Sequence, residues 1–167
     1  MSYSLIGGAD GPTSIFVAGK LGSDWISIGG IVIVLLILLP NIIYAFKFKD
    51  AVNKCTNKFM NVLEQIGRYG CMFFMVFHIG LRGFGFPSVG CFLIYLFGNI
   101  VLLLAYWVIW LLYFGGQKAW RSMALAIIPT CIFLINGVTL VYVPLILCGI
   151  AFGIGHIYVT YQNVKAQ

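Results

Sequence analysis

The sequence predicts an all-α, polytopic integral membrane protein with about five transmembrane helices and an N-terminal segment broken by glycine and proline. Apolar residues make up 62% of the 167 residues and charged residues only 8%, whereas soluble domains carry about 25% charged residues. Several apolar runs approach the ~20 residues that a helix needs to cross the hydrocarbon core. These runs lack the apolar/polar alternation of a lipid-facing barrel strand, which favours helices.

The chain divides into a motif segment, residues 1–22, and a single transmembrane helical domain, residues 23–167. No lysine or arginine precedes Lys20, and the first long apolar run begins near Ile26. This arrangement does not resemble a cleavable signal peptide. We find no internal repeat, and an odd number of spans argues against two matched inverted halves, the usual plan of a secondary transporter.

Five apolar runs predict the five spans. The third is the longest, and the fourth is short and contains Pro129. The fourth could form a tight helical hairpin with the fifth, turning within residues 137–141. In the first span, Pro40 removes a backbone donor and predicts a bend. The predicted spans are residues 26–46, 63–81, 89–114, 122–138 and 143–161.

The segment from Ala51 to Ile66 is amphipathic at helical spacing. Its apolar residues recur every three or four positions, and asparagines and lysines take the opposite side. Two interpretations are equally compatible with this pattern. The segment is either a separate helix in the cytoplasmic interface or a solvated extension of the second span. Glu64 precedes Arg68 by four residues, the favoured order for a helical ion pair.

Basic residues predict the orientation in the membrane. Eight of them share one side if the N-terminus lies outside a cell membrane and the C-terminus lies in the cytoplasm; only Lys20 and Arg82 lie on the other. This distribution accounts for the formal charge of +6 without a nucleic-acid partner. The expected partners are the lipid bilayer and either further copies of the chain or other membrane subunits. The eight residues are Lys47, Lys49, Lys54, Lys58, Arg68, Lys118, Arg121 and Lys165.

Polar residues inside predicted spans are the best pointers to function in a membrane protein. Of the three acidic residues beyond the motif segment, Asp24 and Asp50 are assigned to loops, and Glu64, the second residue of the second predicted span, is assigned to the interface. Without an intramembrane carboxylate, we expect the two histidines to make structural hydrogen bonds rather than a metal site or proton relay. We expect the asparagines to satisfy bent backbone or to bond between helices. The residues are Asn41, His78, Asn99, Asn136 and His156.

The fifth span carries a GxxxG motif, Gly149 to Gly153, whose small-residue face continues through Ala151 and Gly155. Such a face permits close helix packing, either within the chain or between copies. The five cysteines form no CxxC pair and are interpreted as small apolar side chains. No catalytic constellation or cofactor motif is found, so we do not expect the chain to be catalytic by itself.

The N-terminal stretch GGADGPTSIF has a composition suited to a broken membrane element. Gly7, Gly8 and Gly11 permit backbone conformations closed to other residues. Asp10 occupies an N-cap position, and Pro12 suits the first turn of a helix. Exposed carbonyls, a carboxylate and hydroxyls are hard oxygen ligands, so Asp10, Thr13 and Ser14 form a candidate site for a small cation.

This stretch, about residues 4–21, resembles the signature of the β subunit of sodium ion-translocating decarboxylases. The resemblance implies a discontinuous membrane segment in which the aspartate, here Asp10, takes part in sodium and proton movement coupled to decarboxylation. It also implies that Gly7, Gly8, Gly11 and Pro12 shape the break. No family resemblance is found from Asp24 onward.

Two functions remain open on the sequence. The first is a role in sodium ion transport, as a reduced relative of that β subunit. The second is a structural, regulatory or interaction role for a small membrane protein without transport activity. A membrane-embedded enzyme is the least favoured alternative because no catalytic set is present.

Overall fold

The computed structural model describes residues 25–48, 53–79 and 85–166, and these form five α-helices. The predicted all-helical class is confirmed: the described residues contain no strand, only an isolated antiparallel bridge between Ile26 and Phe77. The motif segment lies outside the described residues. The helices are α1 (Ile28–Lys47), α2 (Lys58–Val76), α3 (Val89–Phe114), α4 (Ala119–Thr139) and α5 (Val143–Lys165).

Four of these helices, α1, α3, α4 and α5, are long and apolar enough to cross a membrane. α3 has the predicted bounds, while α4 and α5 are longer than predicted. Side-chain oxygens cap two of the starts: Ser27 accepts from the Gly30 amide at 3.0 Å, and Ser88 accepts from the Cys91 amide at 3.2 Å. The prediction of a membrane protein rests on these four helices.

The second predicted span, residues 63–81, is wrong in its bounds, and α2 is not among the four apolar helices. α2 begins at Lys58 because Asn57 caps it, accepting from the Met60 amide at 3.2 Å. It ends at Val76 because the following chain pairs with the segment before α1. There the Ser27 amide donates to the Val76 carbonyl, and the His78 amide donates to the Trp25 carbonyl, each at 2.9 Å.

The amphipathic segment is an extension of α2 rather than a separate helix. Residues 53–57 are not helical, and the helix runs without a break from Lys58 past Ile66. Lys54 ties the preceding segment to the end of α5, donating through Nζ to the Ala166 carbonyl at 2.8 Å. The exposed face of α2 is an apolar stripe suited to lipid, comprising Phe59, Val62, Ile66, Tyr69 and Phe73.

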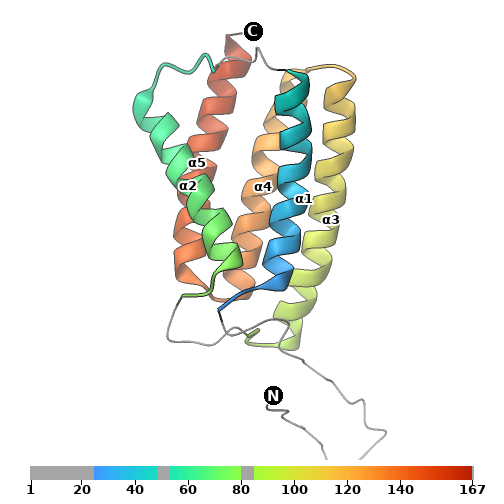
Figure 1. The fold of residues 1–167 in the computed structure, drawn as a ribbon, viewed down its shortest axis with the longest axis vertical. Helices are drawn as coiled ribbons and strands as arrows, with labels where there is room; N and C mark the ends of the chain where they lie inside the picture. The colour runs from blue at the N-terminus through green and yellow to red at the C-terminus, as the bar shows by residue number, and fades with distance from the viewer. Residues whose placement is uncertain (1–24, 49–52, 80–84, 167) are drawn as a thin grey trace, which may run out of the picture.

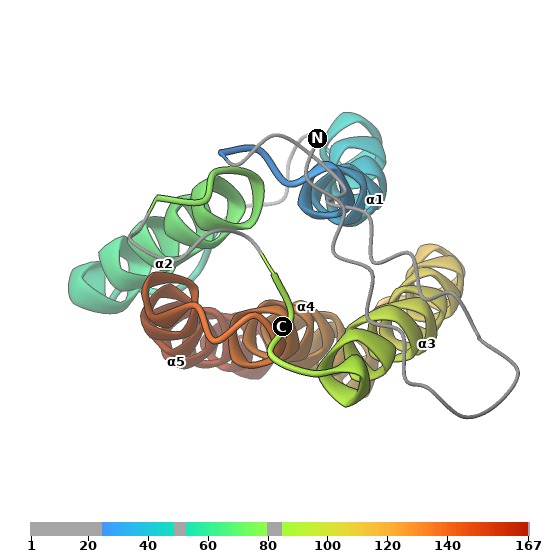
Figure 2. The ribbon, with the colours of Figure 1, turned by 90° about the horizontal axis from the view of Figure 1, so that it is seen from below.

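Successive helices run in alternating directions (Figure 1). Seen from one end, α2 lies beside α5, α4 lies between α5 and α3, and α1 faces them across the bundle (Figure 2). α1 and α2 approach each other at one end and diverge toward the end that holds the C-terminus (Figure 1). α4 and α5 pair as predicted, through a turn at Leu140–Tyr142 in which Val141 has a positive φ of 51°. All five helices therefore border one interior.

Candidate functional site: an ionised cluster beside a central cavity

A buried carboxylate lies where α2 packs on α5. Glu64 is only 5% exposed, and its Oε1 atom lies 2.9 Å from Nδ1 of His156. Arg68, one turn further along α2, donates through Nη2 to the same oxygen. An ionised carboxylate only accepts hydrogen bonds, so Nδ1 of His156 carries a proton in this arrangement. Among the described residues, Glu64 is the single acidic side chain.

Glycines bring this cluster together by letting the two helix backbones approach. A Cβ at Gly155 of α5 would lie 2.6 Å from the backbone nitrogen of Glu64, and a Cβ at Gly67 of α2 would collide with the backbone of Phe152. The neighbouring His156 ring then reaches Glu64, and it stacks on Phe152 with centroids 4.7 Å apart and planes 19° apart. The sequence places the charged groups on two helices, and the close glycine contact makes them neighbours.

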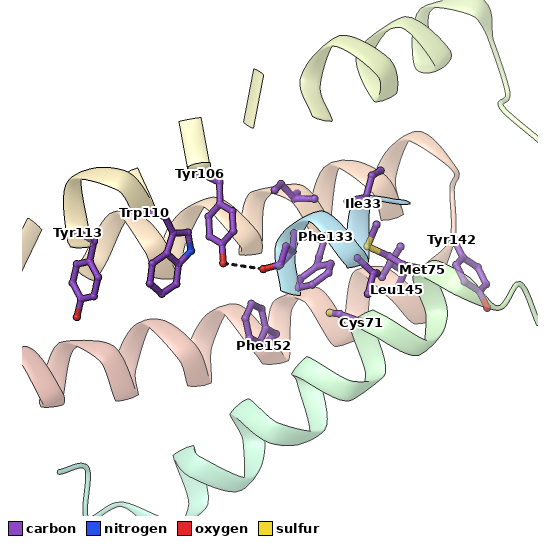
Figure 3. Packing of buried hydrophobic residues seen from close by; sticks show 13 residues of the cluster. Ile33, Cys71, Met75, Tyr106, Trp110, Tyr113, Phe133, Tyr142, Leu145 and Phe152 are labelled. Carbon is purple, nitrogen blue, oxygen red and sulfur yellow. Dashed lines mark hydrogen bonds between the residues drawn. The ribbon is translucent and has the colours of Figure 1, made fainter. Parts of the chain in front are cut away.

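A cavity of about 290 Å³ lies next to the cluster, bordered by residues of all five helices. Arg68 and His156 line it from α2 and α5. Figure 3 shows a row of α3 aromatic side chains, Tyr106, Trp110 and Tyr113, which line it from the other side. The remaining polar lining residues are Asn41, Tyr44, Ser122 and Thr160.

One lining group lacks a normal hydrogen bond. Trp110 is 6% exposed, and its indole nitrogen Nε1 is buried without a hydrogen bond of normal geometry, although it interacts with the neighbouring Tyr106 hydroxyl. By contrast, the hydroxyl of Tyr106 accepts from Asn41 Nδ2 at 2.7 Å and points toward the Ile37 carbonyl at 3.4 Å (Figure 3). Leaving a buried donor unpaired costs about 1–3 kcal/mol, so Trp110 is a position where a ligand acceptor would be favoured.

The predicted asparagines have structural partners, as expected. Asn136 donates to Asn99 Oδ1 at 2.8 Å, joining α4 to α3, and each amide also donates to a carbonyl of its own helix at 2.7 Å. Asn41 donates to the Ile37 carbonyl at 2.8 Å beside Pro40. The Leu36 carbonyl, which Pro40 leaves without its helical donor, accepts from Trp107 Nε1 at 3.2 Å.

The two histidines lie apart from each other. His78 follows the end of α2, where its ring stacks on Tyr142 with centroids 4.0 Å apart. His156 contacts Glu64 near the start of α2. The structure pairs His156 with an acid, Glu64 of α2, and this pairing was not predicted from the sequence.

One feature of the sequence could have predicted that Glu64 points into the bundle. Phe59, Val62 and Ile66 form an exposed stripe, and the acid occupies the opposite face of the helix. In a membrane bundle an apolar stripe faces lipid, so the polar face turns inward. The sequence pattern allows either a helix in the interface or an extension of the second span, and it assigns Glu64 to an interfacial stretch.

The GxxxG face is used within the chain. Cβ atoms at Gly149 and Gly153 would lie 3.0 Å from Leu134 and 2.6 Å from Thr130, both on α4, whereas Gly155 faces α2. The five cysteines are free, as expected, and Cys55 and Cys71 are buried. No group of three His, Cys, Asp or Glu residues that could hold a metal occurs in the described part of the chain.

The candidate sodium site falls outside the described residues. It comprises Asp10, Thr13 and Ser14, with backbone positions Gly7, Gly8, Gly11 and Pro12. Comparison of the chain with protein-family models, curated proteins and solved structures finds no match.

Proposed function

We propose that this chain is a multi-pass cell-membrane protein that takes part in moving a small cation across the bilayer, with sodium as the ion suggested by the N-terminal motif. One observation among the described residues carries the proposal: the buried Glu64–His156 pair beside a cavity. Ionisable groups inside a membrane bundle are costly to bury, and they commonly mark ion or proton pathways.

The cluster has the chemistry of a proton-loading site. With a neutral imidazole, the charges of Glu64 and Arg68 balance. Nδ1 of His156 is bonded to Glu64, whereas Nε2 has no hydrogen bond to a described residue. Nε2 is therefore the ring nitrogen that can accept a hydrogen bond or a proton. In this proposal Asp10 holds sodium and the Glu64–His156 pair holds the proton that sodium exchanges for.

We propose an orientation with the N-terminus outside and the C-terminus in the cytoplasm. Six of the seven lysines and arginines within the described ranges lie near one end of the bundle, while Arg68 lies midway along α2. The positive-inside rule assigns that end to the cytoplasm. Further copies of the chain or other membrane subunits are its proposed partners, besides lipid. The seven residues are Lys47, Lys54, Lys58, Arg68, Lys118, Arg121 and Lys165.

A structural or interaction role without transport is the second candidate, and one feature favours it. Both Arg68 and His156 bond the same oxygen of Glu64, so the described cluster is charge-balanced without any bound cation. In that case the cluster only holds α2 on α5.

The test is ion flux in vesicles that contain the full chain. Under an imposed sodium gradient, the wild-type protein should drive proton movement that a potassium gradient does not. Asp10→Asn and Glu64→Gln should each abolish that flux. Gln65→Ala, a change at the exposed neighbour of Glu64, is the matched control and should retain it.

Two results would overturn the proposal. Equal responses to sodium and potassium in wild type would remove ion specificity, and sodium-driven flux in Glu64→Gln would remove the cluster from the pathway. No wild-type flux, combined with loss of thermal stability in Glu64→Gln, would establish the structural candidate instead.

A further inference from the structure

We infer that the central cavity is a binding site for a small apolar molecule that carries a carboxylate. The inference goes beyond the cation proposal, because it concerns what the cavity binds. The two share Arg68 and His156, so the test observes the Trp110 indole rather than ion flux. It rests on the shape of the cavity, the donors that line it and one buried donor without a normal hydrogen bond.

The volume and the walls suit a small organic ligand. The cavity measures about 290 Å³, near the lower end of the roughly 300–1,000 Å³ typical of such pockets. Phe133, Phe152 and Val34 provide apolar surface, and Ala126, which is 1% exposed, forms part of the wall. A mostly apolar wall with few polar groups holds the body of a ligand by burial and orients it through those groups.

Two of the polar groups on the wall can only donate hydrogen bonds. Arg68 uses one guanidinium nitrogen for Glu64, and its other N–H groups have no partner among the described residues. The Trp110 indole N–H is buried and has no hydrogen bond of normal geometry. The His156 ring adds an acceptor at Nε2, because its Nδ1 carries the proton bonded to Glu64. Glu64 itself is not part of the wall, so the cavity favours an acceptor.

A carboxylate matches this donor set better than a neutral acceptor. It can accept from a guanidinium and from an indole N–H at once, and charge-assisted hydrogen bonds are about twice as strong as neutral ones. A cationic ligand would meet Arg68 with no free carboxylate on the wall to balance it. The ligand could come from the bilayer as a fatty acid or from water as a small organic acid, since both present the same group.

The experiment observes the Trp110 indole directly. The chain has four tryptophans, so selective ¹⁵N labelling yields few indole signals, and Trp110→Phe assigns the one of interest. Octanoate and benzoate represent the bilayer and aqueous sources. Octyltrimethylammonium has the same chain with the opposite charge. A saturable shift of the Trp110 signal is expected with octanoate, benzoate or both, which identifies the source, and not with the cation.

Three variants define the site. Arg68→Gln should weaken carboxylate binding at least about tenfold, the equivalent of about 1.4 kcal/mol. Lys118→Gln removes an exposed charge from the basic end of the bundle and should bind as wild type does. Ala126→Leu fills the cavity without changing charge and should abolish the shift, which keeps the test decisive if Arg68→Gln fails to fold.

Three results would overturn the inference. The first is that neither octanoate nor benzoate shifts the Trp110 signal. The second is that octyltrimethylammonium shifts the signal as much as the carboxylates do. The third is an unchanged shift in Ala126→Leu. Because sodium flux is not the readout, failure here leaves the cation proposal standing, and failure of the flux test leaves this site standing.

Discussion

The interface between α3 and α4 and the interface between α2 and α5 both bury polar side chains, but in different chemical states. In the first, Asn99 and Asn136 bond to each other and to backbone carbonyls, so neutral groups satisfy neutral groups. In the second, a carboxylate is held by a histidine and an arginine beside a cavity. The first interface is therefore built from neutral groups, whereas the second contains an ion pair and a histidine. The comparison shows that buried polar residues in this bundle are satisfied in two chemically different ways.

The largest expected loss of stability comes from replacing a glycine of α5, and it should differ between Gly155 and Gly153. Gly155→Leu should destabilise the protein by about 3 kcal/mol or more, above the usual range for overpacking, because its side chain would meet the backbone of Glu64. Gly153→Leu should cost about 1–3 kcal/mol, because it meets a Thr130 methyl group that can move. Thermal unfolding in detergent measures both.

The control for these variants is Gly90→Leu in α3, where the nearest atom to an added Cβ is Ser88 Oγ at 3.7 Å. It should cost little. Equal losses at Gly153 and Gly155 would show that the α2–α5 contact is no tighter than the α4–α5 contact.

The second effect compares the two polar interfaces directly. Glu64→Leu should cost about 2 kcal/mol, because it leaves the partly buried Arg68 and His156 without their acceptor. Asn136→Leu should cost about 1 kcal/mol, the order found for interhelical hydrogen bonds in membranes. Denaturation in mixed micelles can rank the two variants.

A double change tests whether each cost comes from the interaction. Combining Glu64→Leu with His156→Leu should cost less than the sum of the single changes, and the same should hold for Asn136 with Asn99. Strict additivity in either pair would show that its hydrogen bond contributes nothing to stability.

The smallest effect concerns the α1–α3 contact. Trp107→Phe should cost about 1 kcal/mol or less, because it removes the donor to the Leu36 carbonyl. In a Pro40→Ala background the helix supplies its own donor to that carbonyl, so the cost of Trp107→Phe should nearly vanish. An equal cost in both backgrounds, measured by thermal unfolding, would mean that Trp107 stabilises the contact through packing alone.

Much of the fold follows from local pattern. The apolar runs predicted the helical class, and the bounds of α3 match the prediction. Pro40 predicted a carbonyl without its helical donor, that of Leu36, but Trp107 rather than the expected Asn41 donates to it, while Asn41 bonds the Ile37 carbonyl. The correctly predicted features depend on residues close together in the chain, so hydropathy, capping and the missing proline donor are enough to predict them.

The sequence by itself determined that helices form, which of them are apolar enough for lipid, and which polar residues are available. Only the tertiary structure decided that Glu64 points into the bundle and contacts His156. A helical pattern of apolar and polar residues defines two faces, but it does not indicate which face packs against the other helices. Here the close approach at Gly67 and Gly155 places the polar face of α2 against α5. The Glu64–His156 pair and the five-helix cavity both depend on contacts between residues distant in sequence. No local propensity encodes such contacts, because their energy exists only once the helices have packed.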